Sequence, residues 1–275
     1  MRLDGTPCCP HCKGLLVGLD AEGAPVSDGG ETVRYACQAC ATEYPVVDGV
    51  VDFLPGAVTE RGAAQRVMES DWVVAIYESK WWRASPLFSL CMGIGLEAEM
   101  ALIQRITQPG PTDTILDLAC GPGLYARAFA EGSPERRVFG LDLSWPMLRY
   151  ASKKAARLGI ENLAFLHGNA HAIPLKDASV DVANCCGALH LFRDIQRVLG
   201  ELRCVIKPGG RFSGAMAFVR SDPWSRFKAY MGGKFWKVHP FREEEFKSLL
   251  DAAGFEPTVY HARRIWMIAG GIRRP

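Results

Sequence analysis

The stretch ILDLACGPGLYARAF, residues 115–129, constrains the fold more than any other part of the sequence. An apolar run reaches Asp117, two glycines follow at Gly121 and Gly123, and the next residues have helical spacing. A buried strand that turns through glycines into a helix is typical of α/β proteins that bind a nucleotide cofactor at the carboxyl end of that strand. The motif therefore predicts a parallel sheet with a cofactor loop after its first strand.

Strand-like and helical patterns alternate from residue 110 to the end of the sequence. The run RRVFGLDLS, for example, is followed by the helical pattern WPMLRYASKKAARLG. Such alternation is typical of a parallel sheet with helices on both faces. The last two strand-like runs, FEPTVYHAR and RIWMIAG, are close enough in sequence to pair as a hairpin. We expect an α/β fold, a doubly wound Rossmann-like seven-stranded sheet with an antiparallel C-terminal hairpin.

Two C-x-x-C pairs lie near the N-terminus, and 24 residues separate them. They are Cys9 with Cys12 and Cys37 with Cys40. A two-residue spacer lets both thiolates of one turn face a tetrahedral ion, and two such turns close a four-cysteine zinc site with no position open for water. The metal would also supply folding energy to a short, polar segment. We predict a small zinc ribbon before the α/β domain.

Composition and sequence breaks suggest three parts. The ribbon occupies 1–55, a helical connector or substrate lid occupies 56–109, and the α/β domain occupies 110–275 with a cap insertion at about 220–242. No apolar run approaches the roughly 20 residues that a membrane-spanning helix needs. The first residues carry no apolar signal-peptide core. We expect a cytoplasmic protein.

The residues of the glycine loop discriminate between cofactors. Asp117 lies four residues before Gly121, where a carboxylate suits a cationic amino group and would repel a pyrophosphate. Pro122 removes a backbone donor that a pyrophosphate would need. Asp142, at the end of the second strand, can bind ribose hydroxyls in either case. The loop therefore favours a cofactor that carries an amino acid over a dinucleotide.

Several motifs together resemble those of a known family. LDLACGPGLYARAF, VFGLDLSWPML, GNAHAIPLKDASVDV and LRCVIKPGGRF are similar to the successive motifs of class I S-adenosylmethionine-dependent methyltransferases of the type 11 group, over about 112–270. With CPHCKGLL, CQACATEYPVVDGVVDFL, WWR and GALHLF, the chain resembles zinc-ribbon methyltransferases of bacteria and plant plastids. Its ribbon also resembles that of bacterial 23S rRNA guanine methyltransferases.

The resemblance implies S-adenosylmethionine and zinc as cofactors and assigns roles to residues. Asp117, Gly121 and Gly123 would contact the methionine part, Asp142 the ribose and Leu143 the adenine. Asn169 and Ala170 take the place of the Asp-Ala pair that meets the adenine in this family. The Asn169 side-chain oxygen could still accept a bond from the adenine amino group, though without charge.

Methyl transfer from a sulfonium is an in-line displacement, and much of its catalysis can come from alignment of the reactants. A base is needed only when the acceptor must lose a proton, and no motif fixes one. His190, in GALHLF, and His239, in KVHPF, are candidates for a base or a substrate contact. A structural role is the alternative for both.

Aromatic and basic residues alternate in 220–242. Trp224, Tyr230 and Trp236 there are candidate substrate contacts, with an amphipathic helical lid that has a solvated face as the alternative. Tyr77 and Trp81 of the connector are further candidates, with plain packing as the alternative. Such residues can enclose an apolar or anionic small molecule. They can equally stack nucleic-acid bases.

Charge favours a small-molecule acceptor over RNA. Residues 1–55 carry three basic and eight acidic residues, a net charge of −5, whereas the whole chain is +2. Phosphate contacts dominate RNA affinity and need cations. An acidic ribbon could instead pack on the basic α/β domain or dock a protein partner. An rRNA or tRNA base methyltransferase is the alternative function, and a non-catalytic ribbon-bearing protein is a third. The acceptor, the methylated atom and the oligomeric state do not follow from the sequence.

Overall fold

The computed structural model describes residues 6–26, 31–56, 85, 89–90, 92–220, 222 and 239–275. Most of the expected connector at 56–109 and most of the expected cap at 220–242 lie outside these residues. The domain boundaries at 55 and 109 therefore stay a prediction.

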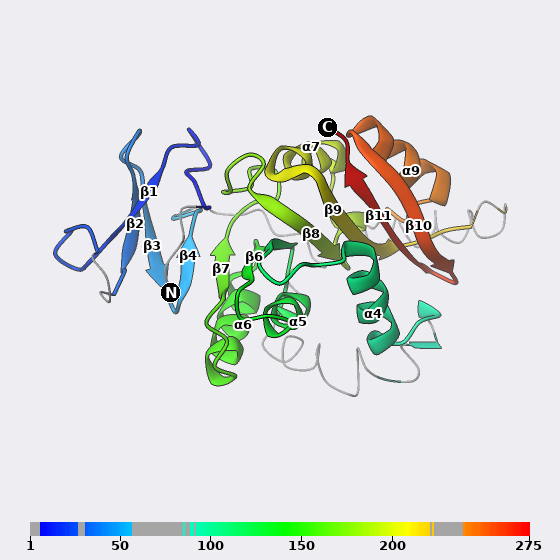
Figure 1. Ribbon diagram of the computed structural model, residues 1–275, viewed down its shortest axis with the longest axis horizontal. Coiled ribbons are helices and arrows are strands. Elements are labelled where there is room, and N and C mark those ends of the chain that lie inside the picture. The colour runs from blue at the N-terminus through cyan, green and yellow to red at the C-terminus, as the bar shows by residue number, and fades with distance from the viewer. Residues whose placement is uncertain are drawn as a thin grey trace.

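One mixed sheet of eleven strands runs through the described residues (Figure 1). The strands follow one another across it in the order β1-β2-β3-β4-β7-β6-β5-β8-β9-β11-β10. In chain order they are β1 (Leu16–Leu19), β2 (Arg34–Cys37), β3 (Glu43–Val47), β4 (Val50–Asp52), β5 (Thr114–Leu118), β6 (Arg137–Asp142), β7 (Leu163–His167), β8 (Val180–Cys186), β9 (Ile206–Ala217), β10 (Phe255–Arg263) and β11 (Trp266–Arg273).

The middle of the sheet is parallel. Strands β4, β7, β6, β5, β8 and β9 pair in parallel, each with the next. Strand β11 is antiparallel to β9 and forms a hairpin with β10. The expected doubly wound sheet with an antiparallel C-terminal hairpin is therefore confirmed.

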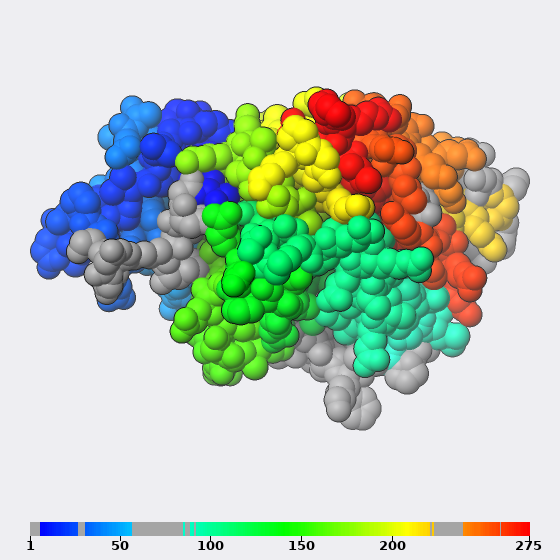
Figure 2. All heavy atoms as spheres, viewed as in Figure 1, coloured from blue at the N-terminus to red at the C-terminus, as the bar shows by residue number. Residues whose placement is uncertain are grey.

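The sheet is longer than the seven strands expected. Four strands from the first 52 residues extend it, because β3 pairs with β4 and β4 pairs in parallel with β7. The ribbon was expected to precede the α/β domain. It does so in the chain, and backbone hydrogen bonds of β4 also join it to the sheet, so that it forms one end of the molecule in Figure 2.

Helices cover both faces of the sheet (Figure 1). On one face lie α4 (Leu96–Thr107), α5 (Leu124–Glu131) and α6 (Trp145–Arg157), and on the other lie α7 (Ile195–Val205) and α9 (Glu243–Ala252). Each face has its own core: Ile103, Phe129 and Leu148 belong to the first, and Leu199 and Phe246 to the second. No helix in the described ranges is long and apolar enough to span a membrane.

Strand β5 lies between these two cores. All five of its residues, TILDL, are buried. Side chains alternate between the two faces of a strand, so Leu116 and Leu118 join the core under α7 and α9, whereas Ile115 joins the core under α4, α5 and α6. Continuous burial explains why this strand reads as an apolar run and makes Asp117 exceptional within it.

The acidic ribbon packs on the α/β domain. Strand β4 pairs Val50 with Phe165 and Val51 with Leu166 of β7. Next to this ladder, Arg149 Nε of α6 lies 2.7 Å from Asp48 Oδ2. An acidic residue of the ribbon thus pairs with a basic residue of the α/β domain. Packing of the ribbon on this domain was one of the two possibilities that the sequence left open, the other being a protein partner.

Close packing between β9, β11 and α4 predicts the effect of one substitution. A Cβ at Gly270 would clash with the Phe212 carbonyl oxygen and lie 2.7 Å from Ile106 Cγ2. We expect Gly270→Ala to lower the free energy of unfolding by about 1–3 kcal/mol, because overpacking strains a filled core. Urea unfolding followed by circular dichroism measures this.

Gly200→Ala is the matched control. Gly200 lies within α7, and a Cβ there would meet nothing within 4 Å. This variant should gain about 0.5–1 kcal/mol from lower backbone entropy in the unfolded chain. Equal effects of the two variants would contradict this view of the packing.

Candidate active site

The glycine loop between β5 and α5 lies at the carboxyl edge of the parallel strands. Gly121 has φ +53°, and a Cβ there would meet nothing within 4 Å. Gly123 has φ +78°, and a Cβ there would lie 3.1 Å from the Phe165 ring and from Ala151. Ala119 also has a positive φ, +53°. Gly121 thus leaves open space beside the backbone, and Gly123 lets α5 pack closely on the sheet.

Asp117 carries the most unusual charge in the loop region. Its carboxyl group is 1% exposed, and its Oδ1 accepts a 2.7 Å hydrogen bond from Asn184 Nδ2 of β8. Its Oδ2 is buried and has no hydrogen-bond partner among the described residues. Burial raises the pKa of Asp117 to about 7, although the Asn184 bond, the backbone N–H of Ala126 and the charge of Arg127 act in the opposite direction. A buried carboxylate oxygen without a donor fits an incoming cationic amino group.

Asp142, the last residue of β6, is held in place by backbone donors. Its Oδ2 accepts a 2.7 Å bond from the Gly121 N–H, and its Oδ1 accepts a 2.7 Å bond from the Ser144 N–H. A carboxylate has about four acceptor sites, so both oxygens can accept further bonds. The carboxylate therefore joins the glycine loop to the start of α6 and can still bind two hydroxyl groups.

The segment after β7 lies beside Asp142, because Gly168 N–H donates to the Asp142 carbonyl at 3.0 Å. Asn169 is exposed and Ala170 is buried. The Asn169 Oδ1 accepts a 3.0 Å bond from the His171 N–H and lies 2.9 Å from His171 Nδ1. The oxygen expected to accept the adenine amino group is thus already bonded within its own loop, which leaves the amide Nδ2 to meet a ligand.

His190 lies in a short 3-10 helix, η1 (Leu189–Leu191), after β8. Its Nδ1 accepts a 3.2 Å bond from the Ala217 N–H, and its ring meets the Trp266 ring edge-on with centroids 6.0 Å apart. Burial lowers the pKa of His190 to about 4. A neutral imidazole whose Nδ1 accepts carries its proton on Nε2. His190 can therefore donate a hydrogen bond near pH 7.

His239 is close to His190 through the backbone, since His239 N–H donates to the His190 carbonyl at 2.9 Å. Its ring, however, is exposed and bonds Glu245 Oε1 at 2.9 Å through Nε2. The structure thus brings the two predicted histidines together but ties the His239 ring to the first turn of α9.

The four predicted zinc ligands form one cluster. The Sγ atoms of Cys9, Cys12, Cys37 and Cys40 all lie within 4.8 Å of one another. The Sγ atoms of Cys9 and Cys40 are 3.6 Å apart, and those of Cys12 and Cys37 are 3.4 Å apart. Tetrahedral zinc with bonds of about 2.3 Å places its sulfur ligands about 3.8 Å apart. The cluster therefore fits a closed, structural zinc ion.

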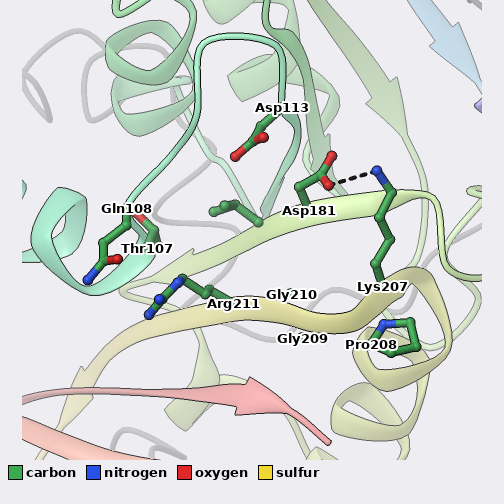
Figure 3. A pocket seen from close by; sticks show the side chains of 10 residues that line it. Thr107, Gln108, Asp113, Asp181, Lys207, Pro208, Gly209, Gly210 and Arg211 are labelled. Carbon is green, nitrogen blue, oxygen red and sulfur yellow. Dashed lines mark hydrogen bonds and ion pairs between the residues drawn. The ribbon is translucent and has the colours of Figure 1, made fainter. Parts of the chain in front are cut away.

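Five predicted substrate contacts lie outside the described residues: Tyr77, Trp81, Trp224, Tyr230 and Trp236. A cavity of about 270 Å³ lies elsewhere, lined by Asp181, Lys207 and Arg211 among others (Figure 3). It opens near the amino ends of β8 and β9, opposite the glycine loop. Ligands of doubly wound sheets bind at the carboxyl ends, so this cavity is not the active site.

Three residues at the site, Asn184, Ser213 and Trp266, were not predicted from the sequence. Asn184 joins Asp117 to Ser213 of β9, whose Oγ donates to Asn184 Oδ1 at 2.8 Å. Both Asn184 and Ser213 are fully buried. A single amide within the apolar strand VDVANCC was a usable signal for Asn184. Trp266 gave no comparable signal, because it lies in an apolar run.

Comparisons with known proteins agree with this geometry. The family described as "Methyltransferase domain" matches residues 115–210. The demethylmenaquinone methyltransferase of Thermus thermophilus is 33% identical over 162 residues, which cover 51% of this chain and 73% of the relative. An uncharacterized chloroplastic methyltransferase of Arabidopsis thaliana is 23% identical over 225 residues, which cover 79% of this chain and 62% of the relative.

Among solved structures, phosphoethanolamine N-methyltransferase 2 of Haemonchus contortus in complex with S-adenosyl-L-methionine has a TM-score of 0.65 and 16% identity. The match covers 80% of this chain and 61% of that chain. At this identity the likeness concerns the fold alone. Together with the matched domain and the Thermus relative, the glycine loop and the acids at the ends of β5 and β6 assign the chain to the S-adenosylmethionine-dependent methyltransferase family.

Proposed function

We propose that the protein transfers a methyl group from S-adenosylmethionine to a small-molecule acceptor by in-line displacement. The observation that carries the proposal is the buried Asp117 Oδ2 without a donor, next to the open space at Gly121. An amino group and an adjacent chain fit this pair of features. The similar proteins named above are methyltransferases of demethylmenaquinone and of phosphoethanolamine, both small molecules.

Each cofactor residue has a proposed role. Asp117 Oδ2 binds the amino group, Gly121 admits the methionine chain, and Asp142 accepts from the ribose hydroxyls. Leu143 and Ala170 flank the adenine, and the Asn169 amide borders it. The cofactor supplies an electrophilic methyl group on a sulfonium, and the chain holds the acceptor in line with it.

His190 is proposed as a hydrogen-bond donor to the acceptor. Its Nδ1 is occupied by the Ala217 N–H, and its low pKa keeps the ring neutral near pH 7. A proton on Nε2 can bond an acceptor oxygen or phosphate, whereas the ring has no vacant nitrogen to remove a proton. The sequence left His190 as a base or a substrate contact, and the proposal keeps the second of these roles.

The charges of the ribbon support a small acceptor over RNA. Arg34 Nε lies 3.3 Å from Glu43 Oε2, and Lys13 Nζ donates to the Ile173 carbonyl at 3.0 Å. These are the cations within residues 6–26 and 31–56, and both are engaged inside the chain. RNA binding depends on cations that neutralise phosphates, so the described ribbon offers a poor platform for it.

Calorimetric titration with S-adenosylhomocysteine, with NAD as the comparison, tests the cofactor site. We expect micromolar binding of S-adenosylhomocysteine alone. Asp142→Ala should weaken it by at least about tenfold, because hydrogen bonds to a charged group are lost. Unchanged affinity of this variant, or preferential binding of NAD, would contradict the assignment.

The raised pKa of Asp117 predicts how cofactor affinity depends on pH. Below about pH 7 the free protein holds a proton on Asp117, and this proton must leave before the carboxylate pairs with the amino group. The dissociation constant should therefore rise by up to about tenfold for each pH unit below 7 and level off above it. Asp117→Asn should bind more weakly and without this dependence between pH 5.5 and 8.5. A flat wild-type profile would show that Asp117 does not pair with the ligand.

The protonation of His190 can be measured without knowing the acceptor. Nitrogen-15 NMR should show a neutral ring protonated at Nε2 throughout pH 5–8, because burial lowers its pKa to about 4. His190→Gln should remove only this signal and leave the other histidine resonances in place. Titration of the ring near pH 6.5 would contradict its role as a neutral donor.

Methyl transfer from labelled S-adenosylmethionine to reduced demethylmenaquinone or to phosphoethanolamine tests the acceptor class. Label incorporated into either compound, or into a related small molecule, supports the proposal. Incorporation into RNA alone would replace it by the nucleic-acid alternative.

A further inference from the structure

The ribbon touches the walls of the cofactor pocket at two places. The first is His167, the last residue of β7, whose side chain is 13% exposed. Its Nδ1 lies 2.7 Å from Asp52 Oδ1 of β4, and its Nε2 lies 3.2 Å from the Leu143 carbonyl oxygen. One ring thus joins the ribbon to the loop proposed to flank the adenine.

The groups around the His167 side chain hold its ring in one orientation. A carboxylate accepts hydrogen bonds, so the Nδ1 that faces Asp52 donates to it, while the Nε2 edge of the ring lies beside the Leu143 carbonyl oxygen. The Asp52 carboxylate is itself oriented, because its Oδ1 also accepts a 2.9 Å bond from the Leu54 N–H. The Trp145 ring meets the edge of His167 with centroids 5.0 Å apart. His167 is therefore a fixed bridge from β4 to the turn between β6 and α6.

The second contact joins the first cysteine knuckle to the segment 172–176, just beyond Asn169 and Ala170. Cys8 N–H donates to the Pro174 carbonyl at 3.0 Å, and Lys176 N–H donates to the Thr6 carbonyl at 3.0 Å. Lys13 Nζ, one residue past the knuckle, donates to the Ile173 carbonyl at 3.0 Å. The chain on both sides of the knuckle is thus hydrogen-bonded to the segment that continues from the proposed adenine wall.

The apolar core continues through the same interface. Ile173 and Leu175 are fully buried and belong to one core cluster with Cys9 and Tyr44 of the ribbon. The knuckle is a turn of few residues, and closed four-cysteine zinc sites supply the folding energy of such turns. Order in the ribbon and order in the segment 172–176 therefore depend on each other.

We propose that the metal-loaded ribbon is a positioning element of the cofactor pocket, acting on the adenine side through Asp52 and His167 and through the first cysteine knuckle. The inference rests on the proposed cofactor site. Its consequence is reciprocal: if zinc strengthens cofactor binding, the cofactor strengthens zinc binding by the same factor. Neither Asp52 nor His167 touches the reacting atoms, so both are positioning residues.

Asp52→Asn in the zinc-loaded protein tests the first contact. The substitution keeps the shape of the side chain and weakens the bridge to His167. We expect the dissociation constant for S-adenosylhomocysteine to rise by about threefold to tenfold, while the calorimetric stoichiometry and the zinc content stay near one per chain. A merely structural defect would lower the stoichiometry instead.

Asp48→Asn is the matched control. Asp48 lies in the same interface and pairs with Arg149 Nε at 2.7 Å, and its carbonyl oxygen accepts from Ser152 Oγ, so these contacts lead to α6 rather than to Leu143. This variant should change the dissociation constant by less than about twofold, since exposed ion pairs contribute little. Equal weakening by both substitutions would refute a specific path through His167.

Release of zinc tests the reciprocal effect. A chromogenic chelator in excess should extract zinc from the wild type at least about threefold more slowly when S-adenosylhomocysteine is saturating. In Asp52→Asn this protection should be smaller. Equal extraction rates with and without the ligand would overturn the inference.

The outcomes separate the two proposals. A wild type that does not bind S-adenosylhomocysteine would refute the proposed cofactor site. A wild type that binds it, with Asp52→Asn binding equally well and zinc release insensitive to the ligand, would refute only the coupling to the ribbon.

Discussion

Parallel pairing from β4 to β9 is the constraint on which the rest of the structure depends. Six parallel strands end at one edge of the sheet, so residues distant in sequence meet there. Asp117, Asp142 and His167 each lie at or next to the end of such a strand. The same ladder that builds the cofactor edge also receives β4 of the ribbon. One hydrogen-bonding pattern therefore sets both the active-site geometry and the place of the metal cluster.

Burying polar groups at the carboxyl ends of the parallel strands costs free energy, and hydrogen bonds offset this cost for only one of the two Asp117 oxygens. Asn184, which itself accepts from Ser213, donates to one oxygen of Asp117, while the other oxygen has no hydrogen-bond partner among the described residues. An unpaired buried carboxylate is unfavourable, and its raised pKa expresses that cost. A ligand that brings a cation to this oxygen would recover the lost stabilisation. The missing hydrogen bond at Asp117 thus lies where the proposed cofactor would place its charged amino group.

Much of the fold could be predicted because local patterns and global topology agree. The run at β5, the glycines after it and the paired cysteines each have one dominant structural solution. The hydrogen-bond state of single side chains could not be predicted in the same way. The proposed donor role of His190 rests on the Ala217 N–H, which is 27 residues away in sequence. The Asn169 oxygen is likewise occupied by its own loop.

The sequence by itself determined the α/β class, the cofactor loop and the pairing of two C-x-x-C turns, because these depend on periodicity and short spacings. Only the tertiary structure decided that β4 joins the sheet beside β7 and that Asp52 meets His167, 115 residues further along the chain. Without β4, β7 would be the edge strand of the sheet, and an edge strand can pair with any short strand of matching shape, so no local pattern states which one. The contact between the ribbon and the proposed cofactor site therefore depends on tertiary packing rather than on any sequence motif.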